Sequence, residues 1–215
     1  MTRDKILQSI IDSGVVAIIR MADTSALFEV VAALKEGGIK CIEFTFAIPN
    51  AVKVIGDHAS KYGSEILVGA GTVMDANSAR QAIEAGAKYI VSPIFWNGII
   101  EVCHDHGAVV IPGAFTPTEI CAAWRAGADM VKVFPANAGG PQYIEDVRRP
   151  LPELRLLPTS GITVGNAGDY IRAGASAVGI GAALVDPELI NRRKFSTLTT
   201  MSKQLVENVK NAREK

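Results

Sequence analysis

Short apolar runs recur along the chain, and their character predicts parallel β-strands. They are rich in β-branched residues, and their apolar positions are nearly continuous rather than alternating with polar ones. This pattern is typical of strands that are covered on both faces. Eight runs are expected strands: residues 15–19, 41–46, 66–70, 89–92, 109–111, 130–134, 155–157 and 177–180.

The segments between these runs are compatible with amphipathic helices that end at glycine. Residues 25–36 and 75–85 place apolar side chains three and four positions apart, and residues 195–215 predict a last helix. Glycine readily adopts the left-handed conformation that ends a helix. The repetition of such glycines before strands predicts successive βα units of a parallel sheet. They are Gly38, Gly86, Gly107, Gly127 and Gly174.

The length of the chain helps to decide between two arrangements of these units. Its 215 residues, divided over eight units, give about 27 residues each, which suits a compact closed barrel. We therefore predict an α/β fold, a (β/α)8 TIM barrel, in a single domain that spans residues 1–215. An open doubly wound sheet is the alternative, but Met21-Ala22-Asp23 follows the first run in place of a glycine-rich nucleotide-binding turn.

Composition and charge exclude several classes of protein. An apolar fraction of 48% with 20% charged residues is typical of a globular chain with a large core. The 22 basic and 22 acidic residues balance, and the tight basic cluster at residues 192–194 is interpreted as solvated surface, so no nucleic-acid partner is expected. The longest apolar stretch, residues 175–185, is too short and too rich in glycine to cross a membrane, so no membrane partner is expected.

The cysteines and the N-terminal residues indicate the cellular compartment. Cys41, Cys103 and Cys121 are odd in number and widely spaced, which predicts neither a disulfide framework nor a metal-ligand motif. The N-terminal residues lack the apolar region of a signal peptide. We therefore expect a cytoplasmic protein with reduced thiols and without a metal or other cofactor.

Two charged residues stand inside runs that should be apolar. Glu43 lies within the second run, and Lys132 lies within the sixth. Strand periodicity places Glu43 on the same face as Thr45, and Lys132 on the same face as Met130 and Phe134. Catalytic groups of (β/α)8 barrels lie at the carboxyl ends of the strands. If these faces point inward, both charged side chains converge on the mouth of the barrel.

This pair of charged residues could have either a catalytic role or a purely structural one. The two residues could form a buried ion pair, or one could face outward beneath a helix, but burying charge without compensation is costly. A lysine in an apolar site can instead act as a nucleophilic amine that forms a Schiff base with a carbonyl substrate. A nearby carboxylate can then transfer the proton that carbon–carbon cleavage requires. A lysine and an acid without metal ligands are typical of a metal-independent class I aldolase.

Two glycine-containing segments late in the chain are consistent with a phosphorylated substrate. One is residues 158–162, after the seventh run, and the other is residues 179–183, around the end of the eighth. Barrels commonly bind phosphate with backbone N–H groups of loops in these positions, where small side chains let an anion approach. Either segment alone could serve only close packing, but both in this order indicate phosphate binding.

These segments resemble the 2-dehydro-3-deoxyphosphogluconate/4-hydroxy-2-oxoglutarate aldolase family over nearly the whole chain. The similar motifs are IEFT (42–45), VGAGTV (68–73), IVSP (90–93), IPG (111–113), VKVFP (131–135) and LPTSGI (157–162). The resemblance implies a homotrimer of (β/α)8 barrels. It also implies a small phosphorylated 2-keto acid substrate, a 2-keto-3-deoxy-6-phospho sugar acid that is cleaved to pyruvate and glyceraldehyde 3-phosphate.

The resemblance also implies roles for individual residues. Lys132 would form the Schiff base, and Glu43 would be the general acid/base. Thr72 would hold the pyruvyl carboxylate, and Pro93 and Phe134 would line the pyruvyl pocket. The other implied substrate-binding residues are Arg20, which could face either the carboxylate or the phosphate, and Thr45, Thr159, Ser160, Gly161, Gly181 and Ala182.

Three positions depart from the family's pattern and leave the substrate open. Ala47 replaces an arginine that pairs with the carboxylate in many members, Ser160 replaces the first glycine of a Pro-Thr-Gly-Gly turn, and Ala182 replaces a frequent serine. Backbone donors survive these changes, and losing one neutral hydrogen bond costs about 0.5–1.5 kcal/mol. The alternatives are a 4-hydroxy-2-oxoglutarate or 2-dehydro-3-deoxy-6-phosphogalactonate aldolase, a phosphate-binding isomerase or synthase, and a non-catalytic barrel that senses keto acids.

The histidines are expected to lie outside the chemistry. His104 and His106 are two positions apart, so they do not share a helix face and do not form a metal site. His58 is interpreted in the same way, as a surface residue of a helix.

Overall fold

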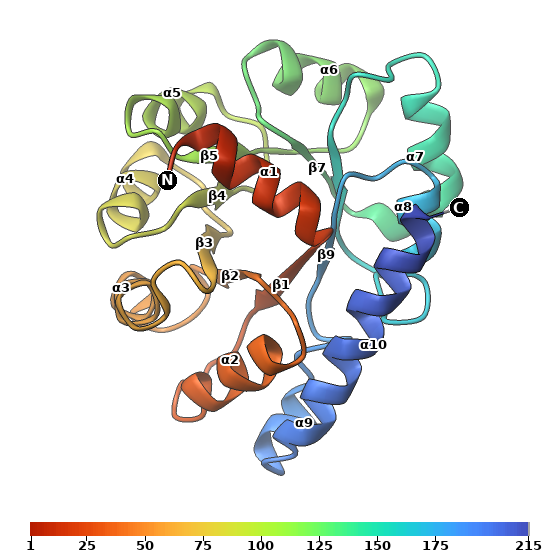
Figure 1. The fold of residues 1–215 in the computed structure, drawn as a ribbon. Coiled ribbons are helices and arrows are strands. Elements are labelled where there is room, and N and C mark those ends of the chain that lie inside the picture. Colours follow the sequence, from red (N-terminus) through yellow and green to blue (C-terminus); the bar gives the residue numbers. More distant parts are fainter. Residues whose placement is uncertain (215) are drawn as a thin grey trace.

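Within residues 1–214, which the computed structural model describes, nine short parallel strands lie at the centre and helices surround them (Figure 1). The strands are β1 (Val15–Ile19), β2 (Cys41–Thr45), β3 (Leu67–Gly71), β4 (Tyr89–Val91), β5 (Val109–Ile111), β6 (Gly113–Ala114), β7 (Val131–Val133), β8 (Leu156–Pro158) and β9 (Val178–Ile180). The helices are α1 (Arg3–Ser13), α2 (Leu27–Glu36), α3 (Ala51–Tyr62), α4 (Ala76–Glu84), α5 (Asn97–Asp105), α6 (Pro117–Arg125), the 3-10 helix η1 (Ala136–Ala138), α7 (Gly140–Arg148), α8 (Ala167–Arg172), α9 (Pro187–Asn191) and α10 (Phe195–Arg213).

The strands form a curled parallel sheet in two parts. One part has the order β5-β4-β3-β2-β1-β9, and the other has the order β6-β7-β8. Thr159 and Gly179 form a parallel bridge between the end of β8 and β9, and at the other junction Asp129 N–H donates to Val110 O across 3.1 Å. Pro112 separates β5 from β6, because proline has no N–H to donate to a sheet. The two parts and their helices form one α/β domain.

The structure confirms the predicted strands and helix ends. Each of the eight predicted strands begins and ends within one residue of its predicted position. The short β6 is an addition, since Gly113 and Ala114 are too few and too small to form an apolar run. The glycines that were expected to end helices all have positive φ: 91° for Gly38, 113° for Gly86, 67° for Gly107, 98° for Gly127 and 99° for Gly174.

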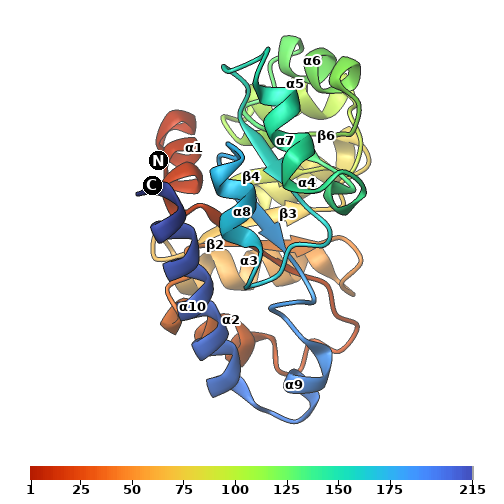
Figure 2. The same cartoon turned by 90° about the vertical axis from the view of Figure 1, so that its right-hand side faces the viewer.

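Side chains of the strands alternate between two apolar layers. In β1, Val16 and Ile18 belong to an inner layer, whereas Ala17 belongs to an outer layer beneath the helices. Helix α1 adds Leu7 and Ile10 to the inner layer. Figure 1 shows α1 across the centre of the curled sheet, and Figure 2 shows it on the same side as both chain ends. Because α1 covers the amino ends of the strands, the carboxyl ends are the open end of the inner layer.

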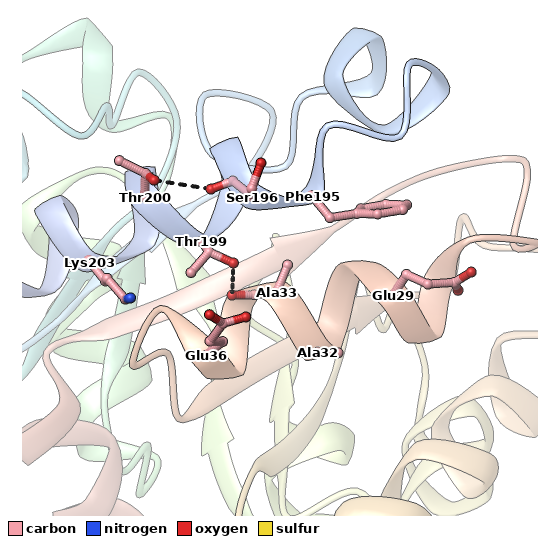
Figure 3. A pocket seen from close by; sticks show the side chains of 9 residues that line it. All are labelled: Glu29, Ala32, Ala33, Glu36, Phe195, Ser196, Thr199, Thr200 and Lys203. Carbon is pink, nitrogen blue, oxygen red and sulfur yellow. Dashed lines mark hydrogen bonds between the residues drawn. The ribbon is translucent and has the colours of Figure 1, made fainter.

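Helix α10 packs against α2 on the outside of the molecule (Figure 3). Thr199 Oγ1 donates to Ala33 O across 3.1 Å. A Cβ atom on Gly37 would lie 2.2 Å from Ser202 Cβ, so glycine is needed for this close approach. The helix predicted over residues 195–215 is thus present as α10, and Lys215 lies outside the described residues. Along the described chain, no helix combines the length and apolar character needed to span a membrane.

His58 is buried, and its prediction as a surface residue is wrong. Only 2% of its surface is exposed, its Nδ1 lies 2.8 Å from Val54 O, and its ring stacks on Phe28 at a centroid distance of 4.2 Å. The reason is helical periodicity, because Ile55, His58 and Tyr62 share the buried face of α3. His106 is exposed, as predicted.

Substitution of Ile10 by alanine should measure how much α1 stabilises the inner layer. Ile10 is fully buried, so the free energy of unfolding is expected to fall by about 2–5 kcal/mol. Ile11→Ala makes the same chemical change at a half-buried position of the same helix and should cost clearly less. Urea denaturation of both variants measures the difference, and equal costs would contradict the role given to α1.

Candidate active site

Glu43 and Lys132 lie in the inner layer, on β2 and β7. Each stands two residues after a member of that layer, Cys41 or Met130, so strand periodicity points both side chains inward. Only 1% of the surface of Glu43 and 6% of that of Lys132 are exposed. The structure therefore places both charged residues in the same apolar interior, as the periodicity predicts.

The Glu43 carboxyl lies over Gly71 of β3. A Cβ atom on residue 71 would lie 1.7 Å from Glu43 Oε1, so glycine leaves the room that this carboxyl occupies. Glu43 Oε2 is buried and has no hydrogen-bond partner among residues 1–214. Burial raises the pKa of Glu43, and the positive charges of Lys132 and Arg20 offset part of this rise. A carboxyl with a raised pKa and an unpartnered oxygen is suited to accept and return a proton.

The Lys132 amine lies beside Phe134, and the backbone of Lys132 pairs with the short strand β6. Its Nζ is 5.2 Å from the centre of the Phe134 ring. Gly113 of β6 is the register partner of Lys132, and a Cβ atom on Gly113 would lie 2.4 Å from the carbonyl of Pro93. The structure thus brings Pro93 and Phe134 to the surroundings of Lys132.

The structure does not support an ion pair between Glu43 and Lys132. In the described part of the chain, no nitrogen–oxygen contact of 4.0 Å or less joins their side chains. Neither residue faces outward, since both are buried in the inner layer. Two charged groups that share an apolar interior without pairing directly are candidates for a chemical role.

Arg20 and Thr72 meet where β1 and β3 end. Arg20 Nη2 donates to Thr72 Oγ1 across 3.2 Å. Thr72 has a φ of 56°, an uncommon conformation for a β-branched residue and one that occurs at functional sites. Thr45, in contrast, is fully buried and donates its hydroxyl to Ile19 O across 3.1 Å. The Thr45 hydroxyl therefore holds β1 to β2 and is not directed at an open cavity.

A cavity of about 460 Å³ lies between the loops that follow β8 and β9. It brings together seven of the residues that the sequence predicts for substrate binding: Arg20, Phe134, Thr159, Ser160, Gly161, Gly181 and Ala182. The N–H groups of Gly161 and Ala182 donate to no backbone carbonyl in the described chain. Free N–H groups in a glycine-containing turn are suited to bind an anion.

Asn137 supports this cavity and was not predicted from the sequence. Ser160 Oγ donates to Asn137 Oδ1 across 3.0 Å, and a Cβ atom on Gly161 would lie 2.4 Å from Asn137 Cβ. Ser160 and Gly161 have φ angles of 86° and 73°. Asn137 lies in η1, a segment without apolar periodicity or motif, so the sequence held no signal for this contact.

The groove between α2 and α10 is separate from this site (Figure 3). Its volume is about 470 Å³, and its charged lining residues are Glu29, Glu36 and Lys203. It contains none of the residues predicted for catalysis or substrate binding. Within residues 1–214, no three or more His, Cys, Asp and Glu side chains are grouped so that they could hold a metal ion.

An amine and a carboxyl buried together within parallel strands, beside a cavity lined by glycine-containing turns, are typical of α/β enzymes that act on carbonyl compounds. Comparison with known proteins gives the particular family. Residues 6–201 match the family model "KDPG and KHG aldolase", so the chain belongs to this family of lyases.

Relatives with assigned names support this membership. The chain is 35% identical over 176 residues to a 2-dehydro-3-deoxy-phosphogluconate aldolase of Treponema pallidum, a match that covers 81% of this chain and 83% of the relative. It is 32% identical over 200 residues to a probable 2-dehydro-3-deoxy-6-phosphogalactonate aldolase of Rhizobium meliloti, a match that covers 91% of this chain and 94% of the relative. The crystal structure of KDPG aldolase from Legionella pneumophila, with pyruvate captured as a covalent carbinolamine, is similar with a TM-score of 0.86 at 25% identity, covering 95% and 98%.

Replacement of Glu43 by glutamine should leave the fold at least as stable as the parent. Since burial raises the folded-state pKa of Glu43, the stability it contributes is present below its unfolded pKa and is lost as pH rises through the folded pKa. Glu43→Gln should remove this loss, which thermal unfolding over about pH 4–9 can measure. If Glu43 instead formed a structural ion pair, the free energy of unfolding of Glu43→Gln would be lower than that of the parent by about 3–5 kcal/mol.

Proposed function

We propose that this protein is a class I aldolase that cleaves a 2-keto-3-deoxy-6-phospho sugar acid to pyruvate and glyceraldehyde 3-phosphate. The observation that carries the proposal is the burial of the Lys132 amine and of Glu43, with its unpartnered oxygen, in one apolar interior. The similar Legionella pneumophila enzyme holds pyruvate as a covalent carbinolamine. That adduct is what an amine forms when it adds to a keto group.

In the proposed reaction, Lys132 Nζ adds to the C2 carbonyl of the substrate, and the carbinolamine loses water to give an iminium ion. Glu43 accepts the proton of the C4 hydroxyl while the C3–C4 bond breaks, and the electron pair of that bond passes into the iminium to give an enamine. The aldehyde leaves, and Glu43 returns the proton to C3. Hydrolysis of the resulting iminium then releases pyruvate and regenerates the lysine.

The remaining site residues are proposed to bind the two anionic ends of the substrate. Thr72 and Arg20, which are hydrogen-bonded to each other at the open end of the inner layer, would bind the carboxylate and compensate for Ala47. Pro93 and Phe134 would enclose the pyruvyl group beside Lys132. The phosphate would lie in the cavity of the late loops, formed by Thr159, Ser160, Gly161, Gly181 and Ala182. In this assignment Thr45 supports the strand ends rather than contacting the substrate.

We also propose that the two parts of the curled sheet form a closed (β/α)8 barrel. Contacts at both junctions, the Thr159–Gly179 bridge and the Asp129–Val110 hydrogen bond, support closure. A cytoplasmic homotrimer is proposed from the family resemblance. It is consistent with a similar solved structure, a protein cage designed by fusing symmetric oligomeric domains, with a TM-score of 0.85 at 26% identity.

A second candidate substrate is the galactonate epimer, 2-dehydro-3-deoxy-6-phosphogalactonate. Relatives named for each epimer match the chain at similar identity, 35% for the gluconate enzyme of Treponema pallidum and 32% for the galactonate enzyme of Rhizobium meliloti. Both substrates carry the keto acid and the phosphate that this site would bind. Their comparison, with 4-hydroxy-2-oxoglutarate as a third substrate, decides which one the enzyme prefers.

Pyruvate followed by borohydride should attach one reduced pyruvyl group to Lys132. Reduction converts the Schiff base to a stable secondary amine that peptide mass spectrometry can locate. Lys132→Met should prevent the adduct and lower kcat for aldol cleavage by at least about 1000-fold. Lys88→Met, the same change at an exposed lysine, is the matched control.

Three results would contradict the proposal. An unmodified Lys132, under conditions that trap a known class I aldolase, would exclude the Schiff base. An isomerase or synthase activity that survives Lys132→Met would favour that alternative, and cleavage that survives it would exclude Lys132 as the catalytic amine. An adduct on Lys132 without any cleavage would favour the keto-acid sensor.

The phosphate should contribute strongly to substrate selection. Two or more charge-assisted hydrogen bonds from the late loops predict a kcat/KM at least about 100-fold higher for a phosphorylated 2-keto acid than for its unphosphorylated analogue. Ala182→Ser, which adds a hydroxyl at the cavity, should raise kcat/KM for the phosphorylated substrate alone by about 2–10-fold. Steady-state kinetics measure both values, and equal rates with and without phosphate would refute the assignment of the cavity.

A further inference from the structure

Tyr89 is a buried polar residue that the proposed reaction does not use. It belongs to the inner layer and is fully buried, and its hydroxyl has no hydrogen-bond partner among residues 1–214. Its ring lies over Gly69 of β3, where a Cβ atom would be 2.3 Å from Tyr89 Cζ. A buried hydroxyl without a hydrogen-bond partner destabilises the folded state, whereas phenylalanine would fill the same space without this cost. The tyrosine at this position therefore indicates that its hydroxyl has a partner.

Tyr89 and Glu43 occupy neighbouring places along β3. Glu43 Oε1 covers Gly71 in the same way as the Tyr89 ring covers Gly69. Consecutive positions on one face of a strand are about 6.6 Å apart, and two hydrogen bonds through one water molecule span about 5.5 Å. The spacing of these two strand positions is therefore of the order that one bridging water molecule can span between the polar groups.

The groups around this position leave Tyr89 as the donor. Cys41 is a titratable member of the inner layer, and burial raises the pKa of its thiol to about 12. Burial also raises the pKa of Tyr89 well above its ordinary value, and the negative charges of Cys41 and Glu43 add to this rise. Tyr89 thus keeps its proton. Lys132 and Arg20 are the cationic groups whose charges act on Glu43.

We propose that Tyr89 is a positioning residue, whose hydroxyl donates through one buried water molecule to Glu43 Oε2. This inference rests on the proposed function, in which Glu43 moves the proton. A hydrogen bond to the charged carboxylate favours that form and opposes the effect of burial. Tyr89 would therefore fix the direction of the free carboxylate oxygen and keep Glu43 able to accept the C4 hydroxyl proton.

Tyr89→Phe tests this role, because it removes the hydroxyl and keeps the ring. The acid-side pKa in the pH profile of kcat/KM should rise by about one unit, and kcat below that pKa should fall about tenfold with KM little changed. The pyruvate–borohydride adduct on Lys132 should still form. Tyr62→Phe removes a hydroxyl that donates to Phe28 O on the outside of the sheet, and it should leave the profile unchanged.

A profile of Tyr89→Phe that superimposes on that of the parent enzyme would overturn the inference. In a Glu43→Gln background, Tyr89→Phe should have no further effect on kcat, and an undiminished further loss would also overturn it. Both failures leave the parent's cleavage and its Lys132 adduct intact. Absence of cleavage and adduct in the parent enzyme would instead overturn the proposed function, and the role of Tyr89 with it.

Discussion

The whole site depends on one constraint, the burial of the Glu43 carboxyl in an interior that offers it no direct partner. Two glycines of β3 make this burial possible, because Gly71 lies under the carboxyl and Gly69 lies under the ring of Tyr89. Helix α1 closes the same interior from the amino ends of the strands with apolar side chains such as Ile10. The low polarity that results raises the pKa of Glu43. The fold thus accepts the energetic cost of burying one carboxyl, which is the group that the proposed reaction would use to transfer protons.

The opposite end of the inner layer is organised differently. The cavity beyond β8 and β9 is bordered by small residues and turns, among them Gly161 and Ala182, whose N–H groups bind no carbonyl of the described chain. Arg20 connects this cavity with the ends of β1 and β3, since it lines the cavity and also donates to Thr72. A substrate with a keto group and a distant anion would therefore extend from the buried amine to the backbone donors.

Sequence patterns account for most of the fold and for the centre of the site. Apolar runs and glycine stops are local signals, and they placed eight of the nine strands of the described chain to within a residue, all but the short β6. Glu43 and Lys132 could be found because a charge inside an apolar run breaks a pattern. Tyr89 and Asn137 could not, because a tyrosine in an apolar run and an asparagine in a loop break none. His58 is the opposite case. Its helical spacing from Ile55 and Tyr62 was a signal for burial, but its polar residue type led to the prediction of a surface position.

Two departures from the family's pattern, Ser160 and Ala182, change side chains and leave the backbone N–H groups of the late loops in place. Ser160 has a φ of 86°, which strains a residue other than glycine, but its hydroxyl donates to Asn137 and so offsets part of the strain. The neighbouring Gly161 also has a positive φ, of 73°, and its N–H donates to no backbone carbonyl of the described chain. Ala182 removes a side-chain hydroxyl and leaves its own N–H in place. In the proposed function, backbone donors would hold the phosphate, so the loss of these two side-chain groups would weaken its binding without abolishing it.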